Sequence, residues 1–490
     1  MGAQMSDAVV VDNTVSAPGQ RDQPLYADRV KVYPKRVSGT FRKLKWWLVG
    51  ILLTIYYLTP WIRWDRGPGA PDQAVLIDMP NRRAYFFFIE IWPQEIYYLM
   101  GLMLLGAVGL FLVTSLAGRV WCGYGCPQTV WTDLFMLVER WIEGDRNARI
   151  KLDKQPLSPA KAGKKVAKHA AWLVIAALTG GAWIMYFNDA PTVVADIFTG
   201  SASTMVYFFV ALFTATTYLL AGWAREQVCT YMCPWPRFQA AMFDEDTLIV
   251  TYQPWRGEPR GKATRRDPRA KRGDCVDCNL CVAVCPMGID IRDGLQMECI
   301  GCALCIDACD SVMDKLELPR GLITYDTERN QVNRAAGKPL SYRLVRPRTV
   351  LYTLLALVIG GAMLWSLAFR ATLDINVLHD RNPLFVTLSD GSIRNGYTVK
   401  ILNMTRAPRD FVLDVEGLAD SVMSVVGREA AGDGTIVLPA APDGVATYQV
   451  FLRAPREVVS EEAMPITFEL TEADGGEAVR RETVFRGPRR

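Results

Sequence analysis

The chain alternates long apolar stretches with strongly polar segments over most of its length. Five apolar stretches approach the length of about 20 residues that a helix needs to cross a bilayer. They cover residues 46–62, 95–117, 169–187, 205–223 and 350–369. The first is the shortest, but its Trp and Tyr residues suit a membrane interface. The pattern predicts a multi-domain membrane protein with an α-helical transmembrane core of about five spans.

A different pattern follows the last apolar stretch. In residues 370–490, seven or so short runs rich in β-branched and aromatic residues alternate with turn signals. The turn signals are Asp390-Gly391, Asp433-Gly434 and Asp443-Gly444. This alternation of short strands and turns predicts a C-terminal all-β sandwich of the immunoglobulin type. Nothing in it resembles a catalytic constellation, and we expect its one histidine, His379, to be structural or merely exposed.

The distribution of basic residues orients the predicted spans. The 490 residues are half hydrophobic with a net charge of +4, values that a soluble protein would also allow. Lys and Arg gather before the first span, between the second and third, and in 256–272, whereas 188–204 has none. By the positive-inside rule, the N-terminus, 118–168 and 224–348 are cytoplasmic and the tail lies outside. Juxtamembrane charge explains the run 256–272 better than nucleic-acid binding, so no nucleic-acid partner is expected.

These patterns divide the chain into five predicted segments. They are a cytoplasmic N-terminal segment (1–45), a transmembrane core (46–250), a cytoplasmic cysteine-rich domain (251–345), a last transmembrane helix (346–369) and an external β-domain (370–490). All twelve cysteines lie in or beside the predicted cytoplasmic segments, and none follows residue 309. A reducing compartment is what labile metal clusters need.

Eight of the cysteines form two runs with the spacing C-x2-C-x2-C-x3-C. This is the ligand pattern of two [4Fe–4S] clusters of the bacterial ferredoxin type, in which the fourth cysteine of each run binds the other cluster. The spacing assigns Cys275, Cys278, Cys281 and Cys309 to the first cluster, and Cys285, Cys299, Cys302 and Cys305 to the second. A zinc ribbon would separate two C-x2-C pairs by about 15 residues or more. Disulfides do not suit a cytoplasmic segment.

The other four cysteines form two copies of C-x-Y-x-C-P. Cys122 and Cys126 follow the second span, and Cys229 and Cys233 follow the fourth. In a helix such pairs share one face; alternatively, the proline starts a helix and leaves Cys126 and Cys233 at N-caps, where the dipole favours a thiolate. Four converging thiolates would suit Cu(I), zinc or an iron–sulfur cluster. The alternative is that four small residues merely pack in the membrane.

The residues after the first copy predict a further helix. Apolar side chains recur at helical spacing after Pro127, which is typical of an amphipathic helix. Together with the preceding span and the cysteine motif, this stretch forms a weak internal repeat with the segment around Cys229 and Cys233.

The sequence resembles the cytochrome c oxidase accessory protein family, CcoG/FixG/RdxA. The resemblance is carried by 119–146, 225–252, 275–316 and 393–403, and it covers nearly everything from about residue 40 onward. It implies a bacterial inner-membrane protein with two [4Fe–4S] clusters and an external immunoglobulin-like domain. It also implies a role in assembly of the cbb3-type haem–copper oxidase through reduction of Cu(II) to Cu(I). The C-x3-C-P cysteines are then its candidate copper or redox site.

Three functions stay open at this point. The first is a cupric reductase that receives electrons from a cytoplasmic donor. The second is a quinol-linked ferredoxin-type electron-transfer subunit, and the third is a non-enzymatic copper-binding assembly scaffold. No nucleotide or flavin motif names the donor, and His169 is alone in the spans, without the partner that a haem would need. Expected partners are the inner membrane, cbb3-type oxidase assembly factors, and a copper transporter or chaperone.

Overall fold

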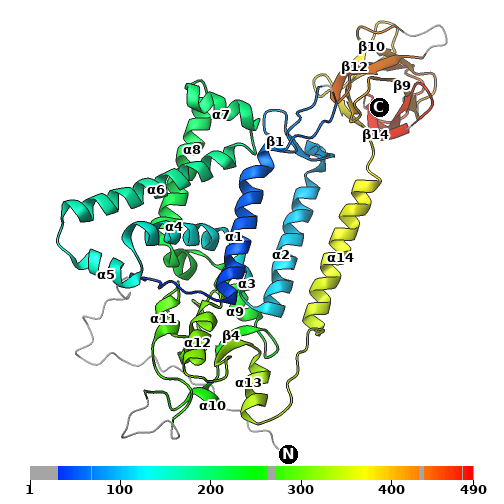
Figure 1. Ribbon diagram of the computed structural model, residues 1–490. Helices are drawn as coiled ribbons and strands as arrows, with labels where there is room; N and C mark the ends of the chain where they lie inside the picture. The colour runs from blue at the N-terminus through cyan, green and yellow to red at the C-terminus, as the bar shows by residue number, and fades with distance from the viewer. Residues whose placement is uncertain (1–30, 68, 263–271, 430–434, 477, 489–490) are drawn as a thin grey trace, which may run out of the picture. The chain divides into compact units, whose positions relative to one another are not determined.

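The computed structural model describes residues 31–67, 69–262, 272–429, 435–476 and 478–488 (Figure 1). They fall into two compact units. The helical unit comprises Met1–Trp64 and Asp72–Leu357, and the β unit comprises Asp65–Pro71 and Val358–Arg490. Much of the predicted N-terminal segment, half of the basic run 256–272 and the turn at Asp433-Gly434 lie outside the described residues.

Helices form at the positions of all five predicted spans. They are α1 (Thr40–Leu58), α2 (Tyr97–Ala117), α6 (Pro159–Ile184), α8 (Thr204–Thr217) with its π-helical continuation η3 (Tyr218–Ala224), and α14 (Pro347–Ala368). Within the described ranges, three helices are long and apolar enough to cross a membrane: Pro93–Ala117, Thr204–Ala224 and Pro347–Ala368. The helices α1 and α6 are not among these three, and the N-terminal part of each contains several basic residues. They remain spans that only the sequence predicts.

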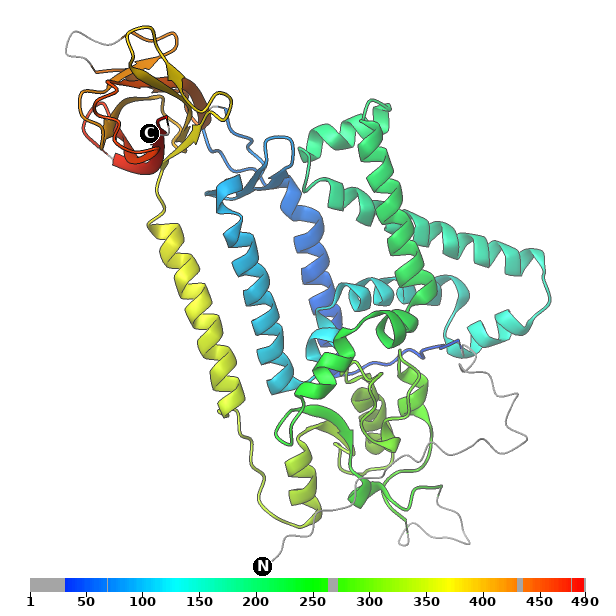
Figure 2. The same cartoon turned by 180° about the vertical axis from the view of Figure 1, so that it is seen from behind.

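Shorter helices connect these elements. They are α3 (Val120–Tyr124), α4 (Pro127–Glu143), α5 (Arg146–Lys154), α7 (Ala190–Thr199), the π-helical turn η4 (Val228–Met232) and α9 (Trp235–Met242). The views from both sides show α6 running obliquely to α1 and α2 (Figures 1 and 2). A three-stranded antiparallel sheet, not predicted from the sequence, also belongs to the helical unit. It consists of β1 (Val75–Asp78), β2 (Arg83–Phe86) and β3 (Ile89–Ile91).

The cysteine-rich segment is built into the helical unit. Its elements are β4 (Ile249–Tyr252), α10 (Pro254–Gly257), α11 (Leu280–Val284), the 3-10 turn η6 (Ile291–Asp293), α12 (Leu304–Lys315), β5 (Ile323–Asp326) and α13 (Glu328–Ala335). β4 and β5 pair antiparallel. The predicted boundary between residues 250 and 251 therefore falls inside a paired strand. Val250, Met313 and Ile323 form a buried core with the cysteines around them.

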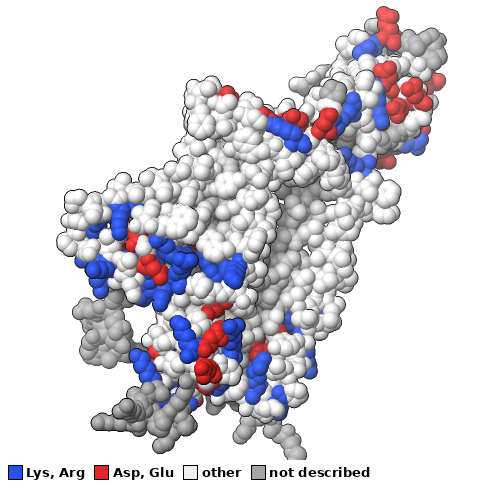
Figure 3. Space-filling model, viewed as in Figure 1, with Lys and Arg blue, Asp and Glu red and all other residues white. Residues whose placement is uncertain are grey.

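Charge is distributed unevenly over the helical unit. In the space-filling view, the face over α2 and the upper parts of the helices is almost free of charged residues (Figure 3). Lys, Arg, Asp and Glu gather instead around α4, α5 and the start of α6, and around the cysteine-rich segment (Figure 3). An uncharged band bordered by charge is what a bilayer-embedded surface requires.

The β unit is a sandwich of two antiparallel sheets. The first holds β10 (Val422–Val425), β12 (Gly444–Ala454), β8 (Ile393–Asn403) and β6 (Leu373–His379), with β7 (Val386–Thr387) paired to β8. The second holds β11 (Val437–Ala440), β9 (Arg409–Glu416), β13 (Ala463–Glu472) and β14 (Ala478–Arg486). Tyr397, Phe411 and Phe468 are fully buried between the sheets. The predicted all-β immunoglobulin-type sandwich is confirmed, and His379 bonds to Asn395 Oδ1 at 2.6 Å.

Candidate functional site

Two neighbouring cavities in the cysteine-rich segment are lined by the eight ferredoxin-type cysteines. The first is lined by Cys275, Cys278, Cys281 and Cys309, together with apolar side chains of α12 and β5. The second is lined by Cys281, Cys285, Cys299, Cys302 and Cys305, together with apolar residues of β4 and α12. Each cavity thus contains the four cysteines that the spacing assigned to one cluster, and Cys281 borders both. The ligand assignment itself stays a prediction.

The two cysteine runs adopt the same backbone conformation. In the first run Asp277 and Asn279 have positive φ angles of 52° and 54°, and in the second Gly301 and Ala303 have 66° and 59°. These are equivalent positions, two and four residues after the first cysteine of each run. Left-handed backbone costs a residue such as alanine roughly 1–2 kcal/mol. The same positions are left-handed in both runs, which indicates that each run folds so that its first three cysteines line one cavity.

The donor set fits [4Fe–4S] clusters. The cavities offer four and five cysteine sulfur atoms, respectively, and otherwise mainly apolar walls, which is the environment of a cysteine-ligated cluster. Burial raises the pKa of the Cys281 thiol to about 11 and that of Cys285 to about 12. At neutral pH these thiols would hold their protons, so binding of iron must displace them.

The C-x3-C-P cysteines lie on three short elements. Cys122 lies within α3, and Cys126 is the N-cap of α4, with Pro127 at the first helical position. Cys229 lies within η4, and Cys233 follows that turn in extended conformation. The N-cap of α9 is Pro234. The interpretation of an N-cap cysteine therefore holds for Cys126 and is wrong for Cys233.

Burial dominates the ionisation of these thiols. It raises the pKa of Cys122 to about 12 and that of Cys229 to about 11. It also raises the pKa of Cys126, against the opposing effect of the backbone N–H groups of Gln128 and Thr129. For the metal-free Cys126 thiol, burial therefore outweighs the stabilisation that the start of a helix gives to a thiolate. A soft metal bound to these sulfurs would reverse that balance.

The four thiols are neighbours. Cys122 interacts electrostatically with Cys126 and Cys229, and Cys126 also with Cys233. Among the described residues, no three His, Cys, Asp or Glu side chains are close enough together to ligate one metal ion. This applies equally to the eight ferredoxin-type cysteines, whose predicted ligand is a multi-atom cluster. The structure thus brings the two motifs together without forming a closed single-metal site.

The first C-x3-C-P motif packs directly on the second cluster cavity. A Cβ atom on Gly123 would lie 2.9 Å from the carbonyl oxygen of Ile300 and 3.0 Å from the Cα of Cys302. The hydroxyl of Tyr124 donates to the carbonyl oxygen of Cys302 at 3.1 Å. Cys122 and Cys302 belong to one apolar cluster. The α3 segment that carries Cys122 is therefore in direct contact with the cavity loop.

Arg119 joins both C-x3-C-P segments to the same cavity. Its Nη1 donates to the carbonyl oxygen of Cys299 at 3.1 Å, and its Nη2 donates to that of Pro236 at 2.6 Å. Pro236 belongs to α9, directly after the second motif. Cys122 Sγ also bonds to Gln239 Oε1 on α9 at 3.2 Å. The planar guanidinium group donates to several acceptors in a fixed geometry, so Arg119 holds the three segments in one arrangement.

Comparison with known proteins identifies the family. Residues 224–328 match the family described as a 4Fe-4S dicluster domain, 99–145 match a 4Fe-4S binding domain, and 363–488 match the IG-like fold at the C-terminal of FixG. The chain is 53% identical over 472 residues to the nitrogen fixation protein FixG of Rhizobium meliloti, covering 90% of each protein. It is 50% identical over 479 residues to protein RdxB of Cereibacter sphaeroides, covering 96% of this chain and 99% of that protein. The chain belongs to the FixG/RdxA family.

Membership of the FixG/RdxA family confirms the resemblance seen in the sequence. The chain is a membrane iron–sulfur electron-transfer protein with ferredoxin-type cluster segments and an immunoglobulin-like C-terminal domain. The matched 4Fe-4S segments include both C-x3-C-P motifs, since Cys122 and Cys126 lie in 99–145 and Cys229 and Cys233 lie in 224–328.

Sequence reasoning missed a buried ion-pair cluster on α4 of this FixG/RdxA-family protein. Glu139 is 1% exposed and accepts from Arg149 at 2.8 Å and from Arg225 at 3.0 Å. Asp133 and Glu143, on the same helix, are also buried and paired with basic side chains. Although burial raises the pKa of Glu139, the surrounding cations outweigh it and lower that pKa to about 2. The sequence signal that could have revealed this cluster was the presence of three carboxylates on one predicted helix, followed by a loop rich in Lys and Arg.

Proposed function

We propose that this protein reduces Cu(II) to Cu(I) for maturation of a cbb3-type haem–copper oxidase. Electrons from a donor reach the cysteine-rich segment and move on to the C-x3-C-P thiols, where Cu(II) is the substrate. Two [4Fe–4S] clusters would supply one-electron carriers whose potentials can lie well below that of copper. Thiols of the two C-x3-C-P motifs would hold the resulting Cu(I), a soft ion that prefers thiolate ligands.

The observation that carries this proposal is the packing of α3 on the loop Ile300–Cys302. Electron transfer weakens steeply with distance, so a redox site beside the second cavity is well placed to receive electrons from it. Gly123 permits the close approach because it has no side chain. Tyr124 and Arg119 hold the two segments together through bonds to the carbonyl oxygens of Cys302 and Cys299.

The accessibility of the thiols suits a site that receives and releases copper. Cys233 is exposed, whereas Cys122, Cys126 and Cys229 are partly buried. An exposed thiol can capture an ion from solution, and partly buried thiols can retain it away from water. Because burial keeps these thiols protonated, copper capture would release protons.

The same proposal places the clusters on the cytoplasmic side and the β unit outside. It rests on the positive-inside distribution of Lys and Arg and on the three apolar helices. A copper transporter or chaperone and the oxidase assembly factors are the proposed partners, with the β unit as a docking module. Fusion of a periplasm-dependent reporter enzyme after residue 488 tests this topology, and absence of reporter activity would contradict it.

The decisive experiment mixes purified, pre-reduced protein with Cu(II) under anaerobic conditions, in the presence of a Cu(I)-specific chelator. Recovery of the oxidised cluster absorption with matching formation of Cu(I) supports a cupric reductase. Clusters that stay reduced while Cu(II) persists would rule it out. Retained oxidase maturation in a variant without the eight ferredoxin-type cysteines would instead favour a copper-binding scaffold.

Variants test the thiol site separately from the clusters. C126S and C233S should keep the cluster absorption and iron content but lose copper reduction. F238L is the matched control, because Phe238 lies on α9 near Cys233, is 58% exposed and carries no thiol. Copper reduction by C126S at the wild-type rate would remove the thiols from the mechanism. Copper, zinc and iron analysis of wild type and C126S identifies any metal resident at the site.

A further inference from the structure

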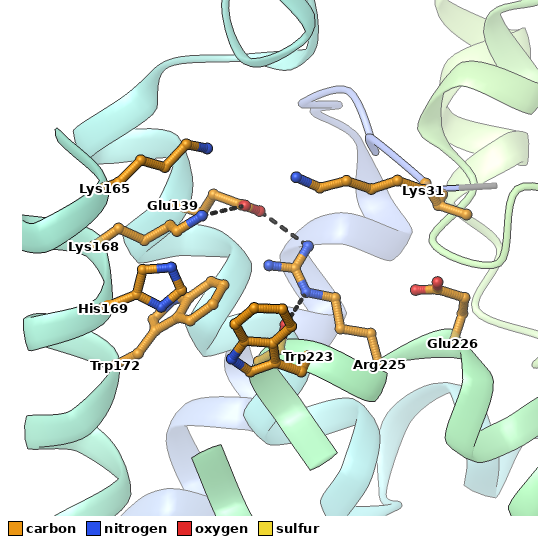
Figure 4. A pocket seen from close by; sticks show the side chains of 11 residues that line it. Lys31, Glu139, Lys165, Lys168, His169, Trp172, Trp223, Arg225 and Glu226 are labelled. Carbon is orange, nitrogen blue, oxygen red and sulfur yellow. Dashed lines mark hydrogen bonds and ion pairs between the residues drawn. The ribbon is translucent and has the colours of Figure 1, made fainter. Parts of the chain in front are cut away.

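A cavity of about 410 Å³ that the proposed function does not use lies between α4, α6 and the end of η3. Its size falls within the range of small-molecule sites. The close-up shows Lys165 and Lys168 from α6 and Lys31 from the N-terminal segment facing the same space, with Glu139 and Arg225 between them (Figure 4). We call it the His169 cavity.

Aromatic rings form one side of the His169 cavity. The His169 ring stacks on Trp223 at 5.9 Å and 24°, and meets Trp172 edge-on at 5.2 Å. Tyr218 Oη lies 2.9 Å from His169 Nδ1. In the tautomer in which Nδ1–H donates to this hydroxyl oxygen, Nε2 is the unprotonated nitrogen that can accept a proton from a ligand. The cavity therefore combines walls for a flat ring with a group able to accept a proton.

The basic side chains of the His169 cavity already have carboxylate partners. Lys168 pairs with Glu143 at 3.0 Å, and Arg225 pairs with Glu139 at 3.0 Å. Lys165 and Lys31 pair with Asp153 at 2.6 and 2.7 Å. A phosphate or an anionic lipid headgroup would have to displace these carboxylates. The cavity is better suited to a neutral ligand that carries polar groups on a ring.

The position of the His169 cavity connects the bilayer to the thiol site. Trp223 lies at the end of the apolar helix Thr204–Ala224 and is 54% exposed, as an interfacial tryptophan would be. Glu226, which also lines the cavity, is three residues before Cys229 and influences its ionisation. Gln128, two residues after Cys126, donates to the carbonyl oxygen of Arg225 at 3.2 Å. A ligand entering from the membrane would thus bind beside both C-x3-C-P motifs.

We propose that the His169 cavity binds the ring of a membrane quinol, which supplies the electrons for copper reduction in place of a cytoplasmic donor. The inference rests on the proposed function for the fate of the electrons. Oxidation of one quinol to the quinone releases two electrons and two protons, and the two electrons reduce two Cu(II) ions to Cu(I). His169 Nε2 takes one proton and the Glu226 carboxylate takes the other, and both pass to water at the membrane surface.

Binding is tested first, without copper. The full-length protein, with its clusters, is placed in nanodiscs and photolabelled with an azido-substituted short-chain ubiquinone. We expect labelled peptides from 165–172 and 223–226, and a roughly 10-fold loss of labelling in W223L and H169Q. W183L is the control, because Trp183 lines a second aromatic cavity of about 410 Å³ next to Pro127. Labelling at Trp183 instead, or labelling displaced by phosphatidylglycerol and not by unlabelled ubiquinone, would overturn the proposal.

Turnover then separates the quinol site from the copper site. With decylubiquinol as donor, H169Q should reduce Cu(II) about 100-fold more slowly than wild type, since the proton acceptor is lost. When the two proteins are instead pre-reduced with dithionite and freed of excess reductant before Cu(II) is added, their single-turnover rates should differ little. Equal quinol-driven rates would refute the role of His169. Photolabelling of the His169 cavity without copper reduction by the pre-reduced wild type would keep the quinol site and reject the cupric reductase.

Discussion

Substitution of Gly123 by alanine tests whether the contact between α3 and the second cavity is as close as described. The new Cβ would lie 2.9 Å from the Ile300 carbonyl oxygen and 3.0 Å from the Cys302 backbone nitrogen and Cα. Carbon atoms prefer separations of at least about 3.5 Å, so α3 or the loop must move by about 0.5 Å. Both neighbours are backbone atoms, so no flexible side chain can absorb the shift. Overpacking of this kind costs about 1–3 kcal/mol.

That free energy should appear as easier opening of the second cavity. A cost of about 1–3 kcal/mol corresponds to a change of about 5- to 150-fold in a local opening equilibrium. We expect the second cluster of G123A to lose iron to a ferrous chelator faster by a factor in this range, because release requires local opening. The first cluster should be affected much less, and electron paramagnetic resonance can follow the two clusters separately.

The control for G123A is the same substitution where space is free. Gly106 lies in α2, and among the described residues no atom outside its chain neighbours and the backbone of its own helix lies within 4 Å of a Cβ built there. G106A should release iron at the wild-type rate. If G123A matched G106A in iron release and in copper reduction, the close packing of α3 on the loop Ile300–Cys302 would be refuted.

Three further substitutions test the neighbouring contacts. R119K keeps the charge but cannot reach the carbonyl oxygens of Cys299 and Pro236 together, so copper reduction should fall and iron release should rise; unchanged values would show that the guanidinium does not hold these segments. Y124F removes one bond to Cys302 and should destabilise the second cavity by about 1 kcal/mol, measured by the same iron release. E139Q leaves Arg149 and Arg225 buried without their carboxylate and should cost about 3–5 kcal/mol, seen as a lower melting temperature. Because the pKa of Glu139 falls from the usual 4.5 to about 2, its contribution of about 3 kcal/mol is present above pH 4.5 and is lost as pH falls toward 2. Thermal melts between pH 7 and 3 should therefore fall more steeply for wild type than for E139Q, and parallel curves would contradict this role.

The sequence predicted those parts of the fold that depend on local pattern. Apolar spacing located α4, and the cysteine spacing anticipated which thiols line each cavity. The burial of Asp133, Glu139 and Glu143 on α4 could not be predicted in the same way. Their partners come from α1, α5, α6 and the residue after η3, and only the tertiary fold brings these segments together.

The two C-x3-C-P copies show where local pattern is insufficient. Both have proline after the second cysteine, which predicted two N-cap cysteines. In the second copy another proline, Pro236, lies two residues further on, and the helix starts one position later at Trp235. The preceding turn η4 is also π-helical, whereas α3 is α-helical. The repeated motif therefore places its cysteines differently in its two copies.

Arg119 has a consequence for how a new copy of this protein is completed in the cell. Its bond to the carbonyl oxygen of Cys299 joins residues 180 positions apart, and its bond to Pro236 joins residues 117 positions apart. The bond to Pro236 can form only after α8 and the start of α9 have been synthesised, and the bond to Cys299 only after the second cysteine run has followed. Among the described residues, both cavities are lined by the segment between Val250 and Ile323, but Arg119 and Tyr124 bond to the loop of the second. Closure of the second cavity is therefore coupled to the packing of α3 against it, so a newly made chain completes this cavity only after segments far apart in the sequence have met.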